Sequence, residues 1–197
     1  MFYKDERIAV FIDGANFFSA AKALNFEIDY RLLREEFMRR GKLIRMCYHI
    51  ALLENDEFTT LRPLVDWLCY NGYSVASKTA REYTDAQGRR KVKSNVAIDI
   101  AVAALELSPH VDHIILFSGD GDLRPLVEAI KRAGVRVSIV STIRSQPSMI
   151  SDELRRTADN FIELDQLKTV ISRPARQQTT SLQDEQNVGT KATEVAI

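Results

Sequence analysis

Short apolar segments alternate with longer amphipathic ones along this chain, and this alternation constrains the fold more than any other feature. The first segment, IAVFI at residues 8–12, is rich in β-branched and aromatic residues and ends at the turn dipeptide Asp13-Gly14. An apolar run without polar interruptions is typical of a strand that is buried on both faces of a parallel sheet. Strands that alternate with helices pack as βαβ units, so the sequence predicts an α/β fold.

The remaining elements follow from the same patterns. We expect strands at residues 8–12, 43–53, 73–77, 111–118, 135–140 and 161–164, and helices at residues 17–24, 30–40, 57–70, 95–107, 123–133 and 147–157. Residues 80–93, which include the turn-forming segment 85–88, are typical of a charged hairpin. Right-handed crossovers between the strands predict a three-layer sandwich with a central, mainly parallel sheet.

Length and composition favour a single domain. The chain has 197 residues, of which 45% are hydrophobic, and this suffices for one sizeable core. The last part has few large apolar residues and many Gln and Thr, so we expect a domain at residues 1–170 and a flexible C-terminal tail at residues 171–197. We expect a cytoplasmic protein without membrane contact, because the sequence shows no signal-peptide pattern and no apolar run long enough to span a bilayer.

Two of the predicted strands end in loops that carry acids. Asp13 directly follows the first strand, and Asn16 lies three residues further on. The strand at residues 111–118 ends in Ser118, with Asp120 and Asp122 close behind it. In open α/β sheets the ligand crevice lies beyond the carboxyl ends of the strands, so the three carboxylates converge there if these strands are neighbours.

Converging carboxylates point to a divalent cation. They repel one another and raise each other's pKa unless a cation lies between them. Mg²⁺ or Mn²⁺ bound by Asp13, Asp120 and Asp122 can activate a water and stabilise charge on a phosphodiester. Asn16 can then orient a water, and Ser118 can donate to a phosphate oxygen. The competing interpretation is that both Asp-Gly loops are only turns.

Several longer segments resemble a known family when they are taken together. FIDGANFF, GRRKVKSN, LFSGDGDLRPLVEAIKRAGVRV and SDELRRTADNFIEL are similar, in this order, to the NYN domain, a branch of the PIN-like nuclease superfamily that includes the LabA-like proteins. The resemblance runs from about Arg7 to Leu167. It implies a PIN-like sandwich and metal-dependent cleavage of RNA. It also implies that four residues match acid-pocket positions and two match polar positions nearby, namely Asp13, Asn16, Asp120 and Asp122, and Ser118 and Lys93.

The sequence departs from the family pattern on the helix at residues 95–107. Ala97 and Ala103 stand where the family usually carries acids, and the nearest acid is Asp99. On a helix Asp99 shares a face with Ala103 but lies about 200° away from Ala97. Asp99 can therefore replace the missing acid in part as a catalytic residue, or it can face solvent or another helix. The alternative function is a catalytically weakened NYN domain that acts as an RNA-binding or protein-interaction module.

Basic residues gather near this helix although the whole chain is neutral. Lys+Arg and Asp+Glu are 27 each, which excludes a globally basic nucleic-acid binder. We expect Arg89, Arg90 and Lys93, together with Arg124 after the second acid loop, to contact RNA phosphates, most simply of single-stranded RNA. The alternative is a solvated hairpin that protects a sheet edge. The sequence leaves a homodimer open.

Other sites are disfavoured by their missing residues. A haloacid-dehalogenase-like phosphatase needs an acid two residues after its nucleophile, and Ala15 occupies that position after Asp13. No Gly-rich loop with a following Gly-Lys-Ser/Thr is present for a nucleotide. His49, His110 and His113 show no ligand spacing, so the sequence does not indicate zinc.

Overall fold

The computed structural model describes residues 2–53, 57–84, 90–93 and 96–174. The strands are β1 (Arg7–Asp13), β2 (Lys42–Leu53), β3 (Ser74–Thr84), β4 (Arg90–Lys93), β5 (His113–Phe117), β6 (Arg136–Ser141) and β7 (Asn160–Glu163). The α-helices are α1 (Gly14–Ala23), α2 (Tyr30–Arg40), α3 (Glu57–Tyr70), α4 (Ala97–Leu107), α5 (Arg124–Arg132), α6 (Asp152–Thr157) and α7 (Leu164–Ile171). Two 3₁₀ turns, η1 (Ser108–His110) and η2 (Gly121–Leu123), precede β5 and α5.

The strands form one sheet in the order β4-β3-β2-β1-β5-β6-β7. Six of them, from β3 to β7 in this order, pair in parallel, and only β4 pairs antiparallel, with β3. The chain builds outward from β1 through β2 to β3 and then returns to add β5, β6 and β7 on the other side of β1. The order therefore reverses between β1 and β5, which is where open α/β sheets bind their ligands.

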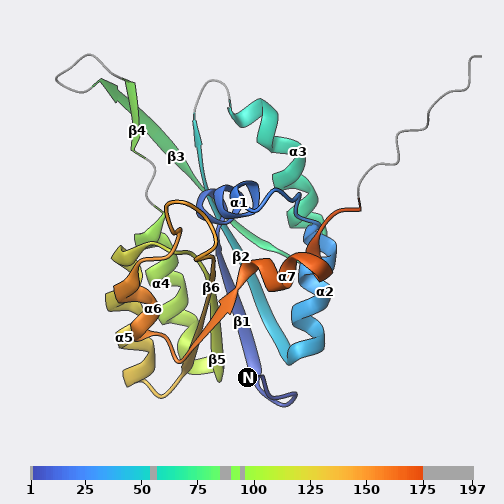
Figure 1. Cartoon of the computed structure of the whole chain (residues 1–197), viewed down its shortest axis with the longest axis vertical. Coiled ribbons are helices and arrows are strands. Elements are labelled where there is room, and N and C mark those ends of the chain that lie inside the picture. Colours follow the sequence, from blue (N-terminus) through green and yellow to red (C-terminus); the bar gives the residue numbers. More distant parts are fainter. Residues whose placement is uncertain (1, 54–56, 85–89, 94–95, 175–197) are drawn as a thin grey trace, which may run out of the picture.

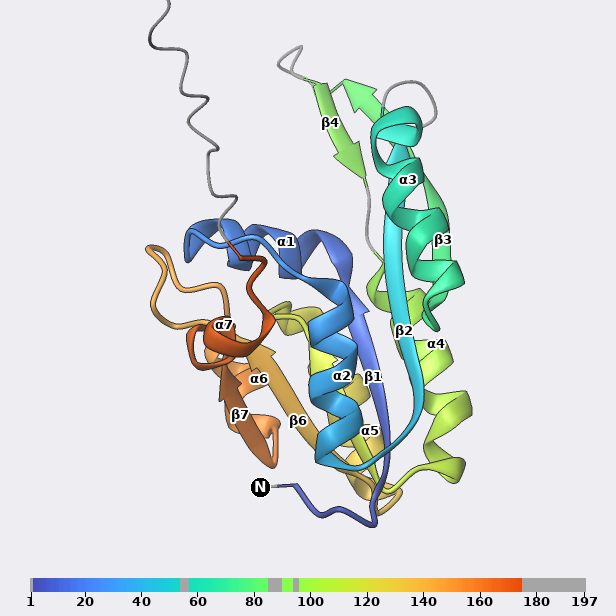
Figure 2. The ribbon, with the colours of Figure 1, turned by 90° about the vertical axis from the view of Figure 1, so that its right-hand side faces the viewer.

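Helices cover both faces of the sheet, so the predicted three-layer α/β sandwich is confirmed (Figure 1). Successive residues of β1 point to opposite faces, as the period of a strand requires. Ile8, Val10 and Ile12 pack in a cluster with α1, α2, α3 and α7, whereas Ala9 and Phe11 pack in a cluster with α4, α5 and α6. Figure 2 shows the first layer from its outer side, with α2 and α3 in front of the strands.

Local sequence signals account for the best-predicted elements. Helix α2 has the bounds expected from the sequence, because the side chain of Asp29 accepts hydrogen bonds from the first turn and Gly41 follows the last residue. Helix α1 begins at Gly14, three residues earlier than expected, because the Asp13 side chain caps it directly. The expected hairpin is present in the described parts of residues 80–93, where β3 continues to Thr84 and pairs with β4.

The structure differs from the expected elements at two places near the C-terminus. Of the helix expected at residues 147–157, only α6 forms, since the serine hydroxyls before it bond to the local backbone instead. Ser145 Oγ, for example, donates to the carbonyl oxygen of Pro147 at 2.9 Å. Helix α7 was not expected, yet it buries Leu167 and Ile171 against the core.

The expected boundary at residue 170 falls inside α7, and Ser172 forms an isolated bridge with Ile28. Residues 175–197, which make up most of the expected tail, lie outside the described residues, so the tail stays a prediction. Among the helices of the described ranges, none combines the length and the apolar character that a membrane crossing needs.

Helix α7 offers a matched pair of substitutions. Leu167 is 2% exposed and Val170 is 39% exposed on the same helix. We expect Leu167→Ala to lower the free energy of unfolding by about 2–5 kcal/mol, because it removes a buried side chain and leaves a cavity. Val170→Ala should change it by no more than about 0.5 kcal/mol. Urea denaturation measures both, and equal losses would show that α7 does not pack on the core as described.

Candidate functional site

Four polar side chains occupy matching positions at the carboxyl ends of neighbouring strands. The register aligns Asp13 of β1 with His49 of β2. The pairing of β1 with β5 ends one residue before Asp13 and Ser118, and continuing it aligns these two residues. The pairing of β5 with β6, continued in the same way, aligns Ser118 with Ser141. All four residues are buried, with exposures of 9% or less. We call His49, Asp13, Ser118 and Ser141 the polar row.

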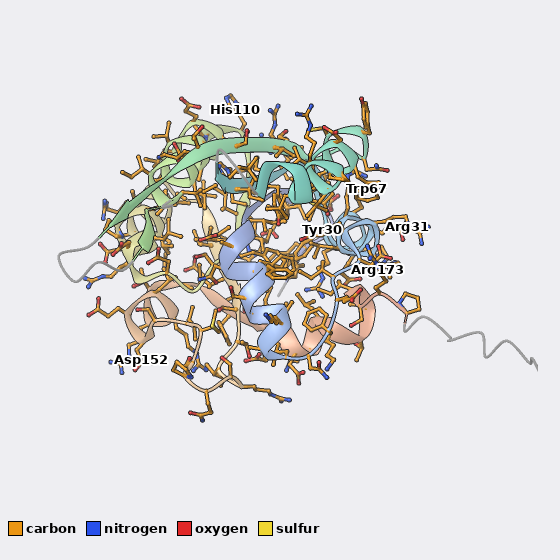
Figure 3. All side chains as sticks on the ribbon, turned by 90° about the horizontal axis from the view of Figure 1, so that it is seen from above. Tyr30, Arg31, Trp67, His110, Asp152 and Arg173 are labelled. Atoms are coloured by element: carbon orange, nitrogen blue, oxygen red, sulfur yellow. The ribbon has the colours of Figure 1, made fainter. Side chains whose placement is uncertain are left out.

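The polar row lies on the face that α4 and α5 cover. Each member follows by two positions an apolar residue of that cluster, as Asp13 follows Phe11 and Ser118 follows Leu116. Because strand residues alternate between faces, the row continues the same face to the edge of the sheet. Figure 3 looks down on this edge, where α1 crosses the middle, with Trp67 of α3 and Asp152 of α6 on opposite sides.

Asp13 is both a helix cap and a buried acid. Its Oδ1 accepts a hydrogen bond from the backbone N–H of Asn16 at 3.1 Å, which fixes the start of α1. Burial raises the pKa of Asp13, and the nearby charge of Asp120 raises it further. Hydrogen bonds from the backbone of Asn16 and Ala15 and from the Ser118 hydroxyl act in the opposite direction without cancelling the rise in pKa.

Asn16 joins the two acid loops. Its Oδ1 accepts a hydrogen bond from the backbone N–H of Gly119 at 3.0 Å, across 103 positions of sequence. Gly119 is held from the other side as well, because its carbonyl oxygen accepts from the N–H of Ser151 at 2.9 Å. A Cβ at Gly119 would lie 1.8 Å from the carbonyl oxygen of Met149, so this close approach requires glycine.

The second acid loop places its two carboxylates differently. Asp120 caps η2, since its Oδ1 accepts from the N–H of Asp122 at 3.0 Å, while the N–H of Asp120 donates to Ser118 Oγ at 3.2 Å. Asp120 is partly buried and is close enough to Asp13 to influence its pKa. Asp122 is exposed and lines a groove between α4 and α5. In the described part of the chain, no three His, Cys, Asp or Glu side chains form a group that could hold a metal ion.

A tyrosine supports the site from below. The ring of Tyr48 packs so closely under Gly14 that a Cβ there would lie 2.7 Å from it. The Tyr48 hydroxyl hydrogen-bonds to that of Tyr30 at 3.2 Å, and burial raises the pKa of Tyr48 well above its usual value. The start of α1 therefore rests on a buried, neutral hydroxyl network.

Asp99 lies on the side of the site toward β2 and β3. It forms an ion pair with Lys78 of β3, with 3.0 Å between Oδ2 and Nζ. Burial lowers the pKa of His49, and the charge of Asp99 opposes this in part. Neither ring nitrogen of His49 has a hydrogen-bond partner among the described residues. Ala97 is 7% exposed at the start of α4, next to this region.

The structure places the expected phosphate-binding residues unevenly. Arg124 forms ion pairs with Glu128 at 2.8 Å and with Glu153 at 3.3 Å, so its charge is already compensated. Arg90 and Lys93 lie on β4. Arg89 lies outside the described residues.

Sequence reasoning missed His49, Ser141 and Tyr48. His49 showed no ligand spacing, and its relation to Asp13 arises only from the pairing of β1 with β2. Ser141, whose buried Oγ lacks a partner among the described residues, likewise joins the site only through strand register. The signal that could have revealed them is a polar residue at the end of an otherwise apolar strand.

The doubly wound sheet, with two acid loops joined at its switch point, defines a nuclease-like α/β domain of the PIN-like kind. The NYN domain family matches residues 7–165, and the chain belongs to this family. Over 180 residues it is 29% identical to the "Low amplitude and bright protein LabA" of Synechococcus elongatus, covering 89% of this chain and 93% of that protein. It is therefore a LabA-like NYN domain protein.

A solved structure agrees with this assignment. The crystal structure of VPA0982 from Vibrio parahaemolyticus, a protein of unknown function, superposes with a TM-score of 0.67 at 27% sequence identity. The match covers 81% of this chain and 93% of that one. The PIN-like fold expected from the sequence is confirmed.

The raised pKa of Asp13 gives a test of its environment. The folded protein binds this proton more tightly than the unfolded chain, whose carboxyl has a pKa near 3.8. The resulting stability is complete below that value and is lost as pH rises through the folded pKa. Asp13→Asn keeps a capping oxygen but removes the charge, so it should gain free energy of unfolding relative to wild type between about pH 4 and pH 7.

Urea denaturation of both proteins across this pH range measures the difference. Asp152→Asn, at an exposed carboxylate on α6, serves as the control and should show little change with pH. A loss of stability on Asp13→Asn that grows toward neutral pH would mean that the Asp13 carboxylate is stabilised rather than strained by its surroundings.

Proposed function

We propose that this protein is a metal-dependent ribonuclease, with Asp13, Asp120 and Asp122 as the acids that hold Mg²⁺ or Mn²⁺. The observation that carries the proposal is the junction of the two acid loops through Asn16 and Gly119 at the point where the strand order reverses. This junction brings Asp13 and Asp120 into electrostatic contact in a mostly buried setting. Membership of the NYN family supports the same chemistry.

The donor set fits a hydrated ion better than an enclosed one. The charge of Asp120 acts on the carboxyl group of Asp13, while Asp122 is exposed on the surface. Mg²⁺ is commonly bound by one or two carboxylates and completes its shell with water and substrate phosphates. An ion held here would supply an activated water and offset the charge that develops on the phosphodiester.

The other residues of the site act through position and hydrogen bonding. Asn16 keeps the two loops in register through its Oδ1, and its amide nitrogen is the group proposed to face substrate. The Ser118 hydroxyl accepts from the N–H of Asp120 and donates to Asp13, and it is proposed to turn its proton to a phosphate oxygen when an ion occupies the Asp13 carboxylate. Asp99 is proposed to contribute to catalysis indirectly, since its negative charge reaches His49, the neighbour of Asp13.

The β3–β4 hairpin is the proposed path for the RNA backbone. The hairpin rises beyond the carboxyl end of the sheet, the end at which the acid loops follow β1 and β5 (Figure 1). Its strands carry Arg81, Arg90, Lys91 and Lys93. With such a cationic segment near the acids, flanking phosphates of the RNA can bind to the hairpin while the phosphodiester that is cut reaches the ion. A single strand suits this path, because its backbone is free to bend toward the centre.

The second candidate is an NYN domain that binds RNA or a protein partner without efficient cleavage. Ala97 and Ala103 favour it, because α4 offers no carboxylate at those positions. The ion pair of Asp99 with Lys78 favours it too, since the one acid in the first turn of α4 is already bonded to a cation. Cleavage and binding assays separate the two candidates.

The first test is cleavage of labelled single-stranded RNA with Mn²⁺ or Mg²⁺. We expect wild-type protein to cut the RNA and Asp13→Asn or Asp120→Asn to abolish cutting, because each removes an anionic metal ligand. Asp5→Asn, at an exposed carboxylate before β1 on the opposite edge of the sheet, is the control and should cut like wild type. RNA that stays intact at high protein concentration but shifts on a gel would replace the nuclease with the binding module. RNA that is neither cut nor bound would refute both RNA functions.

The second test concerns the hairpin. Changing Arg89, Arg90, Lys91 and Lys93 to Gln should weaken RNA binding and flatten its dependence on salt, by up to about 3 units of slope if all four contact phosphates of a single strand. Binding is measured by fluorescence anisotropy at several salt concentrations.

A matched variant controls for the loss of positive charge. It carries four Gln substitutions at exposed arginines away from the hairpin, namely Arg31, Arg39, Arg45 and Arg156. We expect its salt slope to stay close to wild type. If both variants lose the same slope, general charge rather than the hairpin attracts the RNA.

A further inference from the structure

Helix α4 carries an apolar stripe that is exposed to solvent. Ile98, Val102 and Leu105 are 70%, 52% and 44% exposed. Their spacing of four and three residues places them on one side of the helix, whereas Ile100 and Ala104 on the other side are buried against the sheet. A helix that is apolar almost all round is normally buried on both sides.

A groove runs beside this stripe. It lies between α4 and α5, which are neighbours on the same face of the sheet (Figure 1), and has a volume of about 420 Å³. Its walls are formed mainly by small and apolar residues, including Ala97, Ile98, Ala101 and Leu105 of α4 and Pro125, Leu126 and Ala129 of α5. Ile98 and Leu105 therefore belong both to the stripe and to the rim of the groove.

The lining of this groove does not suit RNA as the occupant. The described residues that line it are apolar apart from Asp122, and none is a cation that could pair with a phosphate. An apolar helix with anchors four and three residues apart is the kind of ligand that fits such a groove. Helix α4 is itself such a ligand, because its stripe has this spacing, and the stripe lies on the same surface as the groove. A single surface with both a protruding stripe and a groove is able to pair with a second copy of itself.

We propose that two copies of this chain associate through α4, with the Ile98–Val102–Leu105 stripe of each copy seated in the α4–α5 groove of the other. This inference concerns association and does not depend on the proposed nuclease activity. It gives the homodimer that the sequence left open a specific surface.

The positions of the stripe and the groove determine which two-fold axis relates the two copies. An axis that runs parallel to α4, between the stripe and the groove, places the stripe of each copy over the groove of the other. An axis perpendicular to α4 in the plane of contact would instead place stripe against stripe and groove against groove. Only the first arrangement buries both stripes, so the two α4 helices run in the same direction.

The charges select the same axis. Glu106 lies on the flank of α4 that faces away from the groove, and Arg132 lies at the last turn of α5 on the groove's other side. Both side chains are exposed, and both helices run from the acid loops toward the opposite edge of the sheet. An axis parallel to α4 brings Glu106 of one copy near Arg132 of the second copy. An axis across the helices would bring the acidic flanks together.

The size of the surface predicts a concentration-dependent dimer. Helix α4 has 11 residues and is therefore roughly 16 Å long. A face made of two helices of about this length falls at or below the roughly 800 Å² per partner of a standard stable interface. The dimer should therefore form reversibly as the protein concentration rises.

Sedimentation of the full chain over a range of concentrations tests the proposal. Wild type should shift from monomer to dimer, whereas Val102→Glu should stay monomeric under the same conditions because it places a charge in the centre of the contact. Glu is a better helix former than Val, so the fold should survive, which circular dichroism checks. Val170→Glu makes the same change at an exposed position of α7 and should dimerise like wild type. Asp13→Asn should do so as well.

Charge reversal and crosslinking test the arrangement. Glu106→Arg and Arg132→Glu should each weaken the dimer, and the double variant should restore it. In a Cys69→Ser background, which removes the exposed cysteine, Val102→Cys should be trapped as a covalent dimer by a short bismaleimide and Val170→Cys should not. A wild type that stays monomeric at every concentration would overturn the proposal. So would a dimer that Val102→Glu leaves intact, or one that Val170→Glu disrupts equally.

Discussion

The hydrogen bond from the Gly119 N–H to Asn16 Oδ1 is the contact on which the candidate site depends. It connects the loop after β1 to the loop after β5, and these strands are neighbours because the strand order reverses between them. The pairing of the strands places Asp13 beside the start of the second loop, and this bond fixes that loop so that Asp120 stays close to Asp13 against the repulsion of the two charges. The glycine at position 119 and the loop that contains Met149 hold the other side of the junction.

Much of the fold could be predicted because local signals and burial agree. Helix α2 begins after the cap Asp29 and ends before Gly41, and β1 is apolar from Ile8 to Ile12. Helix α7 could not be predicted in the same way, because the burial of Leu167 depends on tertiary contacts. The loop before α6 was missed because the local hydrogen bonds of its serines compete with a helix.

The candidate site likewise contains residues that could be predicted from the sequence and residues that could not. Asp13, Asp120 and Asp122 were recognisable as acids that follow predicted strands. Their neighbours His49 and Ser141 were not, because strand register alone aligns them with the site and a sequence read by itself contains no register. The departure at Ala97 now has a structural context as well. This residue forms part of the wall of the α4–α5 groove, where an acid would make an apolar surface polar.

The proposed nuclease chemistry requires Asp13 and Asp120 to hold a divalent ion together. Calorimetric titration of Mn²⁺ into the wild-type protein and into Asp13→Asn measures this binding. We expect a saturable heat of binding in the wild type that disappears in the variant, while the variant remains folded. Equal heats in the two proteins, or no saturable binding in the wild type up to millimolar metal with a single-stranded RNA present, would contradict it.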